Sequence, residues 1–309
     1  MKILVTGSNG LLGQKLVYNI AYDSSVELVA TARGENRLKL QSGYVYEQLD
    51  ISNQLEVEQI VAKHKPDCII HTAAMTNVDE CETNPKNCNL LNTDAVQFFV
   101  DAIENHSSQT HFIHLSTDFI FDGENGPYDE EAIANPISIY GHSKWDAEKI
   151  VQQSNIIWSI VRTIIVYGIT DNMSRSNLVL WAKQNLENHK EINVVNDQYR
   201  SPTLAEDLAD GCILIAKKKA EGIYNISGPK TESILELVYT VADYFNLDKQ
   251  YIKPITSASL NQTAKRPPRT GFVLNKARKE LGYNPHTFTE GIKVVMEQFD
   301  SFQLDNIKT

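Results

Sequence analysis

The chain has 309 residues, of which 42% are hydrophobic and 22% are charged, and its formal net charge is −10. This balance is typical of a folded globular protein made of one large domain or of a domain with a smaller partner. The negative charge argues against binding of nucleic acid, which normally requires a basic surface. A small anionic ligand is not excluded, because a few backbone N–H groups and arginines can hold one.

Cysteine spacing and hydropathy narrow the class of protein further. The cysteines form no C-x-x-C pair, and no histidine–cysteine cluster has the spacing of a zinc site, so we expect no metal. The N-terminal residues show no signal-peptide pattern, and no apolar run approaches the ~18 residues of a membrane span. We therefore expect a cytoplasmic protein with reduced thiols and no membrane partner.

Short apolar runs alternate with amphipathic stretches over the first two-thirds of the chain. Uninterrupted apolar strands separated by helices indicate βαβ units, and therefore an α/β protein with a doubly wound parallel sheet of the Rossmann type. The predicted strands are Lys2–Thr6, Val26–Ala32, Cys68–His71, Phe112–Ser116, Trp158–Arg162 and Ile192–Val195. The predicted helices are Leu11–Ala21, Asn53–Lys63, Asn89–Asn105 and Ser143–Gln153.

A glycine-rich turn joins the first predicted strand to the first helix. One glycine permits the tight turn, the next lets the backbone approach a pyrophosphate, and the third lets the helix pack on the strand. The spacing is GxxGxxG, and an ordinary β–α turn is the alternative. Its place at the start of a βαβ series favours dinucleotide binding, with cofactor contacts from Gly7, Asn9, Gly10, Leu11, Leu12 and Gly13.

The end of the second predicted strand bears on the choice of cofactor. A carboxylate there would bind the adenosine 2′-hydroxyl and favour NAD, but the strand ends at Ala32-Arg33 without an acid. Arg33 can pair with a 2′-phosphate, which favours NADPH, with NADH as the alternative. A solvated arginine is the other reading of this residue. Asp50 and Ile51 end the next short strand, where a carboxylate can accept a hydrogen bond from adenine.

Tyr140 and Lys144 form a YxxxK pair. On a helix this spacing places both side chains on one face. A nearby ammonium stabilises the phenolate and lowers the tyrosine pKa from about 10, so that the tyrosine can exchange a proton near neutral pH. A surface pair on a helix is the alternative. The glycine turn and the segment STDFIFDG at 116–123 occur in the same chain, and this combination favours a catalytic role for the pair.

The alternation of strands and helices loosens after Tyr167. We predict a dinucleotide-binding domain at 1–168, which 192–228 partly rejoins through a strand at 222–227. Residues 169–191 and 229–309 are predicted to form a smaller C-terminal domain that binds substrate at the carboxyl edge of the sheet.

Together these motifs resemble the extended short-chain dehydrogenase/reductases, and among them the dTDP-4-dehydrorhamnose reductase group. The resemblance covers nearly the whole chain. Its segments are GSNGLLG, HTAAMTNVD, STDFIFDG, NPISIYGHSK, DQYRSPTLAEDL, Arg266-Pro267 and the LNKA run at 274–277.

The resemblance implies roles for individual residues. Tyr140 would donate the proton to the substrate carbonyl, Lys144 would anchor the nicotinamide ribose, and Thr117 would hydrogen-bond the reacting oxygen. Asn92 would support Lys144 through a water molecule. The remaining expected contacts are Ala73, Ala74 and Met75 with the cofactor, and Thr76, Val78 and Asp118 with the substrate.

Three further positions bear on the substrate. Arg200 is a candidate for binding a substrate diphosphate, with a structural turn as an equal alternative. Related sugar-nucleotide 4,6-dehydratases carry Asp-Glu after the threonine, whereas this chain has Asp118-Phe119. Phenylalanine cannot transfer a proton, so carbonyl reduction is favoured over dehydration. The reductase group usually has a tryptophan where this chain has Ile165, which leaves the sugar nucleotide open.

We therefore expect NADPH-dependent reduction of the 4-keto group of a nucleotide-linked 6-deoxy sugar, by a protein that is compatible with a homodimer. One alternative is a non-catalytic regulatory subunit of the methionine adenosyltransferase beta type, and another is a sugar-nucleotide epimerase. The intact Thr117, Tyr140 and Lys144 favour an enzyme.

An acidic segment is predicted to be a solvated loop, with a divalent ion or a subunit contact as the alternative. It contains Asp122, Glu124, Asp129, Glu130 and Glu131.

Overall fold

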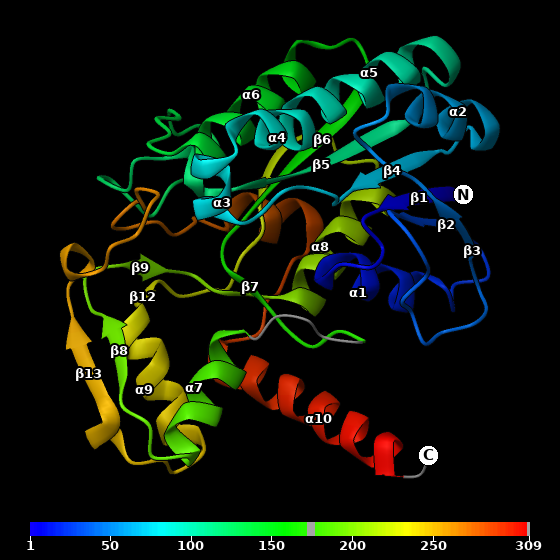
Figure 1. Ribbon diagram of the computed structural model, residues 1–309. Helices are drawn as coiled ribbons and strands as arrows, with labels where there is room; N and C mark the ends of the chain where they lie inside the picture. Colours follow the sequence, from blue (N-terminus) through cyan, green and yellow to red (C-terminus); the bar gives the residue numbers. More distant parts are fainter. Residues whose placement is uncertain (172–176, 308–309) are drawn as a thin grey trace.

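The structure is a computed structural model that describes residues 1–171 and 177–307. Within them, a seven-stranded parallel sheet has the strand order β11-β6-β5-β4-β1-β2-β3 (Figure 1). The direction of strand addition reverses between β1 and β4, which makes the carboxyl ends of these two strands the expected ligand-binding crevice. The strands are β1 (Lys2–Thr6), β2 (Glu27–Ala32), β3 (Val45–Gln48), β4 (Cys68–His71), β5 (His111–Thr117), β6 (Ile157–Thr163) and β11 (Gly222–Asn225).

Helices cover both faces of this sheet, so the predicted doubly wound α/β fold is confirmed. Alternate residues of a strand point to opposite faces. Leu4 of β1 accordingly packs in a core with α2 (Gln54–His64), α5 (Ala95–His106) and α6 (Ile139–Gln153). Its neighbours Ile3 and Val5 pack in a second core with α1 (Leu11–Ile20), α8 (Ala205–Lys218) and the π-helical turn η5 (Ala277–Leu281). Figure 1 shows the first group of α-helices above the sheet and the second below it.

A third core lies outside the main sheet, in the lower part of Figure 1. It is built from α7 (Leu178–Glu187), α9 (Ile234–Tyr244), α10 (Phe288–Ile307) and the parallel pair β8 (Ile192–Val195) and β13 (Ile252–Ile255). The 192–195 segment is thus a strand, as expected, but it does not join the main sheet. The apolar pattern of β8 indicates a buried strand but does not specify its neighbour. Its partner β13 was not predicted as a strand, because it contains Pro254.

Short elements connect the two parts of the molecule. β7 (Val166–Tyr167) pairs with β10 (Thr203–Leu204), and β9 (Tyr199–Arg200) pairs with β12 (Glu232–Ser233). The remaining elements are α3 (Val78–Thr83), α4 (Pro85–Asn89) and the short helical turns η1 (Leu90–Asp94), η2 (Asp118–Ile120), η3 (Lys249–Tyr251) and η4 (Ser257–Ser259). The domain boundaries given above remain a prediction, and their residues 172–176 and 308–309 lie outside the described part of the chain.

Two predicted helices have different bounds in the structure. The helix expected at 89–105 is divided into α4, a π-helical turn and α5, and the π turn carries Asn92. Single π turns are frequent at functional sites. The helix expected at 143–153 begins at Ile139, because the Ser138 hydroxyl caps it by accepting a hydrogen bond from the Gly141 amide at 3.1 Å. Tyr140 and Lys144 therefore both lie on α6.

No helix in the described ranges is long and apolar enough to cross a lipid bilayer.

Candidate active site

The glycine turn lies at the carboxyl end of β1, where the direction of strand addition reverses. Gly7 has φ +69°, and a Cβ at this position would lie 2.9 Å from the Ala73 amide nitrogen. A Cβ at Gly13 would lie 2.2 Å from the Gly7 carbonyl oxygen, so close packing of α1 against the turn requires glycine there. At Gly10 the Cβ would meet the same oxygen at 3.2 Å. Two of the three glycines are therefore required by the packing of the protein itself.

The N-terminus of α1 has the features of a phosphate site. Gly10 is its N-cap, with no side-chain cap and no acidic residue in the first turn of this described helix. The first N–H groups of a helix have no intrahelical partner and carry the positive end of the helix dipole. An anion such as a pyrophosphate can satisfy them.

Asn9 organises the loop that follows β2. Its Nδ2 donates to the Glu35 carbonyl at 2.8 Å, and its Oδ1 accepts from the Arg37 amide at 2.9 Å. Arg33 in this loop is exposed. The pKa of Asp50 is lowered mainly by a hydrogen bond from the Ser52 hydroxyl, and the positive charge of Arg33 also lowers it. Arg33 and Asp50 thus lie close enough for their charges to interact, and Ile51, the next residue after Asp50, is buried.

Residues 73–75 follow β4 across the crevice from the glycine turn. The Ala73 amide donates to Thr6 Oγ1 at 3.2 Å. Asn92 holds both backbone groups of Met75, accepting from its amide at 2.8 Å and donating to its carbonyl at 3.0 Å. It also donates to Ser143 Oγ at 3.0 Å. The direct contacts of Asn92 are therefore with the 73–75 loop, which includes Ala74, with α6 and with the Cys88 thiol of α4.

The two predicted substrate contacts after this loop differ in exposure. Thr76 is exposed, whereas Val78 is half-buried. Val78 packs against the small apolar cluster of Met75, Cys81, Cys88 and Tyr140. The side chain at 78 thus lies against the cluster that contains the tyrosine.

Tyr140 is buried, with 8% of its surface exposed. Burial raises the pKa of its hydroxyl; a hydrogen bond with Thr117 lowers it, and the Asp118 carboxylate raises it, with a net shift upwards. Phe119 packs edge-on against the tyrosine ring, with centroids 5.6 Å apart. Tyr140 is consequently protonated at neutral pH, which suits a proton donor.

Lys144 lies one turn further along α6 and is also buried. Burial lowers its pKa to about 8, against an opposing effect of the Glu148 carboxylate. Its Nζ lies 3.2 Å from His114 Nε2. The Tyr140 pKa is thus raised by burial, rather than lowered by Lys144 as expected. The Lys144 ammonium contacts His114 instead. The sequence reasoning missed His114. Its spacing of two residues from Ser116 places both side chains on the same face of β5, the face that α6 covers.

Asp118 and Arg200 form a buried ion pair beside Thr117. Arg200 Nε lies 3.6 Å from Asp118 Oδ2, and both side chains are 2% exposed. The guanidinium also donates to the backbone carbonyls of Pro267 at 2.7 Å and Tyr199 at 2.7 Å. Arg200, a candidate for binding a substrate diphosphate with a structural turn as the equal alternative, is thus enclosed by protein groups, which favours the alternative. Asp118 likewise contacts protein groups, including the Thr270 hydroxyl.

Ile165, at the position of the family tryptophan, has an unusual backbone. Its φ is +32°, which is rare for a β-branched residue, and its side chain is 37% exposed. The Thr203 amide donates to the carbonyls of both Ile164 and Ile165 at 3.1 Å and so holds this conformation. The residue therefore lies between β6 and β7 (Val166–Tyr167), with a partly exposed apolar side chain.

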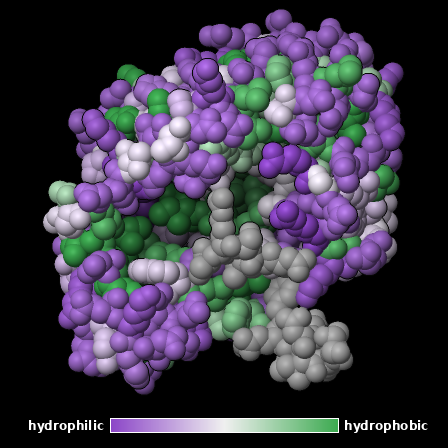
Figure 2. All heavy atoms as spheres, viewed as in Figure 1, coloured by the Kyte–Doolittle hydropathy of each residue, from purple (hydrophilic) through white to green (hydrophobic). Residues whose placement is uncertain are grey.

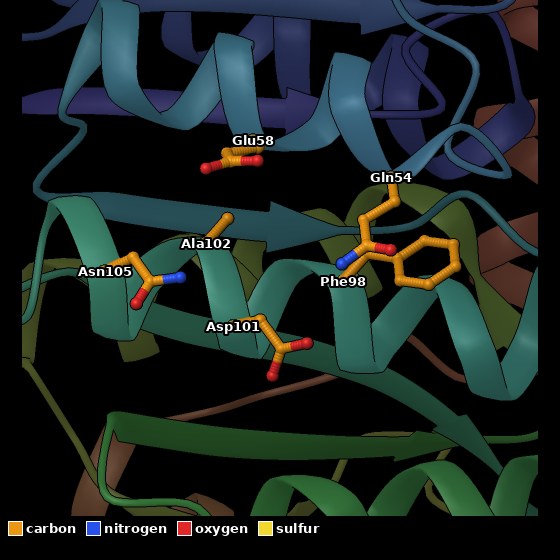
Figure 3. Close-up of a pocket in the computed structure, with 6 residues that line it drawn as sticks. All are labelled: Gln54, Glu58, Phe98, Asp101, Ala102 and Asn105. Atoms are coloured by element: carbon orange, nitrogen blue, oxygen red, sulfur yellow. The ribbon is translucent and has the colours of Figure 1, made fainter.

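Figure 2 shows a hollow between the upper and lower parts of the molecule, with apolar residues lining part of it. A separate cavity of about 20 Å³ lies between α2 and α5 (Figure 3). It has room for about one water molecule, and none of the predicted site residues lines it. Among the described residues, no group of three or more His, Cys, Asp or Glu side chains is arranged to hold a metal ion, the acidic segment at 122–131 included.

Comparison with known proteins places this geometry in a family. The family model of the RmlD substrate binding domain matches residues 1–301. The chain is 30% identical to methionine adenosyltransferase 2 subunit beta of Mus musculus, over 94% of this chain and 86% of that protein. It is 29% identical to the dTDP-4-dehydrorhamnose reductase of Aggregatibacter actinomycetemcomitans, over 94% of this chain and 97% of that protein.

A solved structure agrees with these matches. The crystal structure of the Bacillus anthracis dTDP-4-dehydrorhamnose reductase in complex with NADP has a TM-score of 0.82 and 27% identity, covering 96% of this chain and 99% of that one. The predicted resemblance to the dTDP-4-dehydrorhamnose reductase group of extended short-chain dehydrogenase/reductases is thereby confirmed. The chain belongs to the family of the RmlD substrate binding domain.

Proposed function

We propose that this protein reduces the 4-keto group of a nucleotide-linked 6-deoxy sugar with NADPH, NADH being the alternative cofactor. The observation that carries the proposal is the buried Tyr140 of α6, which packs against Phe119 and whose pKa is raised by burial, so that it keeps its proton. Lys144 follows on the same face of α6. Thr117, Tyr140 and Lys144 are the donors that carbonyl reduction requires.

The residues around the crevice fit the cofactor. The uncapped N-terminus of α1 would hold the pyrophosphate, Arg33 the 2′-phosphate and Lys144 the nicotinamide ribose. Asp50 and Ile51 would border the adenine, and the 73–75 loop would line the cofactor's length. When bound, NADPH supplies the hydride to the carbonyl carbon.

The protein's own contribution is to bind the carbonyl oxygen and protonate it. The hydroxyls of Thr117 and Tyr140 would both donate to this oxygen, and Tyr140 would release its proton as negative charge develops there. Phe119 cannot act as an acid or base, so it offers no route to elimination of water from the sugar. Because Arg200 is enclosed by protein groups, we no longer assign it to the substrate diphosphate.

A second candidate is a subunit that assembles with a methionine adenosyltransferase. The observation favouring it is the 30% identity to the Mus musculus beta subunit over nearly the whole chain. The apolar Ile165 in place of the family tryptophan is compatible with it. The intact Thr117, Tyr140 and Lys144 favour turnover.

A panel of dTDP-, GDP-, UDP- and CDP-linked 4-keto-6-deoxy sugars separates the two candidates. We expect NADPH to be consumed with at least one of them by the unaltered protein and by Tyr22→Phe, a control at a tyrosine that is 78% exposed. Tyr140→Phe should lose this activity. No NADPH loss with any sugar, together with co-elution with a methionine adenosyltransferase, would favour the second candidate. We also propose that the protein is cytoplasmic and that it forms a homodimer. Its mass in solution would test the homodimer.

A further inference from the structure

Two buried histidines lie behind the candidate active site, on neighbouring strands of the sheet. His114 of β5 is fully buried and its Nε2 lies 3.2 Å from Lys144 Nζ. His71 of β4 is 2% exposed, and its Nδ1 lies 2.9 Å from Thr6 Oγ1. The two rings stack with centroids 5.9 Å apart. Strand alternation explains why His114 faces α6, because Phe112 and Ser116, two residues either side, face it too.

The contact with Lys144 fixes the proton positions on His114. An ammonium group has donors only, so His114 Nε2 must accept and its Nδ1 must carry the hydrogen. Burial lowers the pKa of His114 well below 6.5, and the nearby Lys144 and His71 lower it further. Burial likewise lowers the pKa of His71 to about 3. Both imidazoles are therefore neutral, and the positive charge belongs to Lys144.

The other groups that face Lys144 are already engaged. Glu148, one turn along α6, accepts from the Arg162 guanidinium at 2.8 Å and from the Ser116 hydroxyl. The Cys88 thiol of α4 lies 3.4 Å from Ser143 Oγ. A buried ammonium without a hydrogen-bond acceptor is costly. Among the described residues, His114 is the acceptor available to Nζ.

We propose that His114 is a positioning residue, which as a neutral imidazole holds the Lys144 ammonium in the orientation needed for the cofactor ribose and for proton transfer at Tyr140. Its catalytic consequence rests on the proposed function. The arrangement also explains why Asn92 can be committed to Met75 and Ser143, since Lys144 has a direct protein acceptor.

Nitrogen NMR of histidine-labelled protein tests the contact without any substrate. We expect the His114 signals, assigned by their loss in His114→Gln, to show a protonated Nδ1 and an unprotonated Nε2 that do not titrate between about pH 5 and about pH 7, where Lys144 keeps its charge. The Lys144→Met variant should shift the Nε2 signal. A protonated Nε2, or titration of His114 near its ordinary pKa, would overturn the proposal.

Three variants test the consequence. His114→Phe keeps a ring but removes the acceptor, and we expect kcat and NADPH affinity each to fall about tenfold or more, with the KM for the sugar nucleotide little changed. His114→Gln, whose amide oxygen can accept from Lys144, should restore most of both. His111→Phe removes a buried histidine from the same strand that bonds Ser159 instead, at 2.7 Å, and should leave kcat unchanged.

Equal losses in His114→Phe and His114→Gln, or full activity in His114→Phe, would contradict a positioning role. If no keto sugar is reduced by the unaltered protein, the proposed function fails. The NMR result and the NADPH affinities of the same variants would then still decide the role of His114.

Discussion

Arg200 Nε lies 3.6 Å from Asp118 Oδ2, and this buried pair joins β9 to the turn that follows the carboxyl end of β5. Asp118 adjoins Thr117, whose Oγ1 lies 3.2 Å from Asp118 Oδ1. The same carboxylate accepts from the Thr270 hydroxyl, which lies far along the chain. The pair therefore links the C-terminal segment to the residues that would bind the carbonyl oxygen.

Replacing Arg200 with Met should destabilise the fold strongly. It leaves the Asp118 carboxylate buried without its cation, which typically costs about 3–5 kcal/mol of unfolding free energy. Lys230→Met, which breaks an exposed pair with Glu232, is the matched control and should have little effect. Urea unfolding at neutral pH measures both. Similar small changes in the two variants would contradict the importance of the buried pair.

The loss of unfolding free energy in Arg200→Met should depend on pH. Burial raises the pKa of Asp118 in the folded protein, against the lowering effect of Arg200, so loss of Arg200 raises it further. A carboxyl with a raised folded pKa makes the folded state bind more protons than the unfolded state, and stability then falls as pH rises through that window. The loss of unfolding free energy should shrink from about pH 8 to about pH 5, and Asp118→Asn in the same chain should remove this dependence.

Lys144→Met should stabilise the protein while it abolishes activity. The folded pKa of Lys144 is lowered to about 8, so the unfolded chain binds more protons between this value and the ordinary 10.5. Stability due to this group is therefore reduced below about pH 8 and recovers as pH rises. We expect the variant to gain about 1–3 kcal/mol at neutral pH, and the gain to shrink towards about pH 10 in urea unfolding. An unchanged or lower stability at neutral pH would be the contrary result.

Alanine variants at Gly10 and Gly13 should affect NADPH affinity and stability to different extents. Gly10 has φ −84°, which alanine adopts readily, so Gly10→Ala, with its Cβ 3.2 Å from the Gly7 oxygen, should cost less stability than Gly13→Ala but bind NADPH at least about tenfold more weakly. Gly13→Ala places a Cβ 2.2 Å from the Gly7 oxygen and should cost about 1–3 kcal/mol of stability. Fluorescence titration with NADPH and thermal unfolding measure the two effects. Unaltered NADPH affinity in Gly10→Ala would argue against a pyrophosphate at this turn.

Arg33→Ala should change the preference between cofactors. A charge-assisted hydrogen bond to a 2′-phosphate contributes about 1.5–3 kcal/mol, so NADPH affinity should fall about tenfold to a hundredfold while NADH affinity stays within about twofold. Lys190→Ala, at another exposed cation, is the control. Equal losses for both cofactors would show that Arg33 does not read the phosphate.

The parts of the site that lie close together in sequence were predictable. The turn 7–13 has a fixed strand–turn–helix geometry, and the interval between Tyr140 and Lys144 places them on one helix face whatever the surrounding fold. The doubly wound sheet followed from the same local periodicities, because buried parallel strands read as uninterrupted apolar runs.

The contacts between distant segments were not predictable. Arg200 reads as a candidate anion ligand until its partners, Asp118 and the carbonyls of 267–268, are known. His114 reads as one more polar residue of a strand, because its partner Lys144 lies on the helix that follows. The pKa of Tyr140 depends on burial, which the spacing of YxxxK does not report.

The most direct test of the proposed reaction is deuterium transfer from NADPH labelled at the reactive carbon of nicotinamide to the 4-keto sugar nucleotide that the panel identifies. We predict one deuterium per product molecule at C4 of the sugar, and a rate that falls about a hundredfold or more in Tyr140→Phe, because the carbonyl oxygen then lacks its proton donor. Product without deuterium at C4, or Tyr140→Phe turning over at the rate of the unaltered protein, would contradict the account.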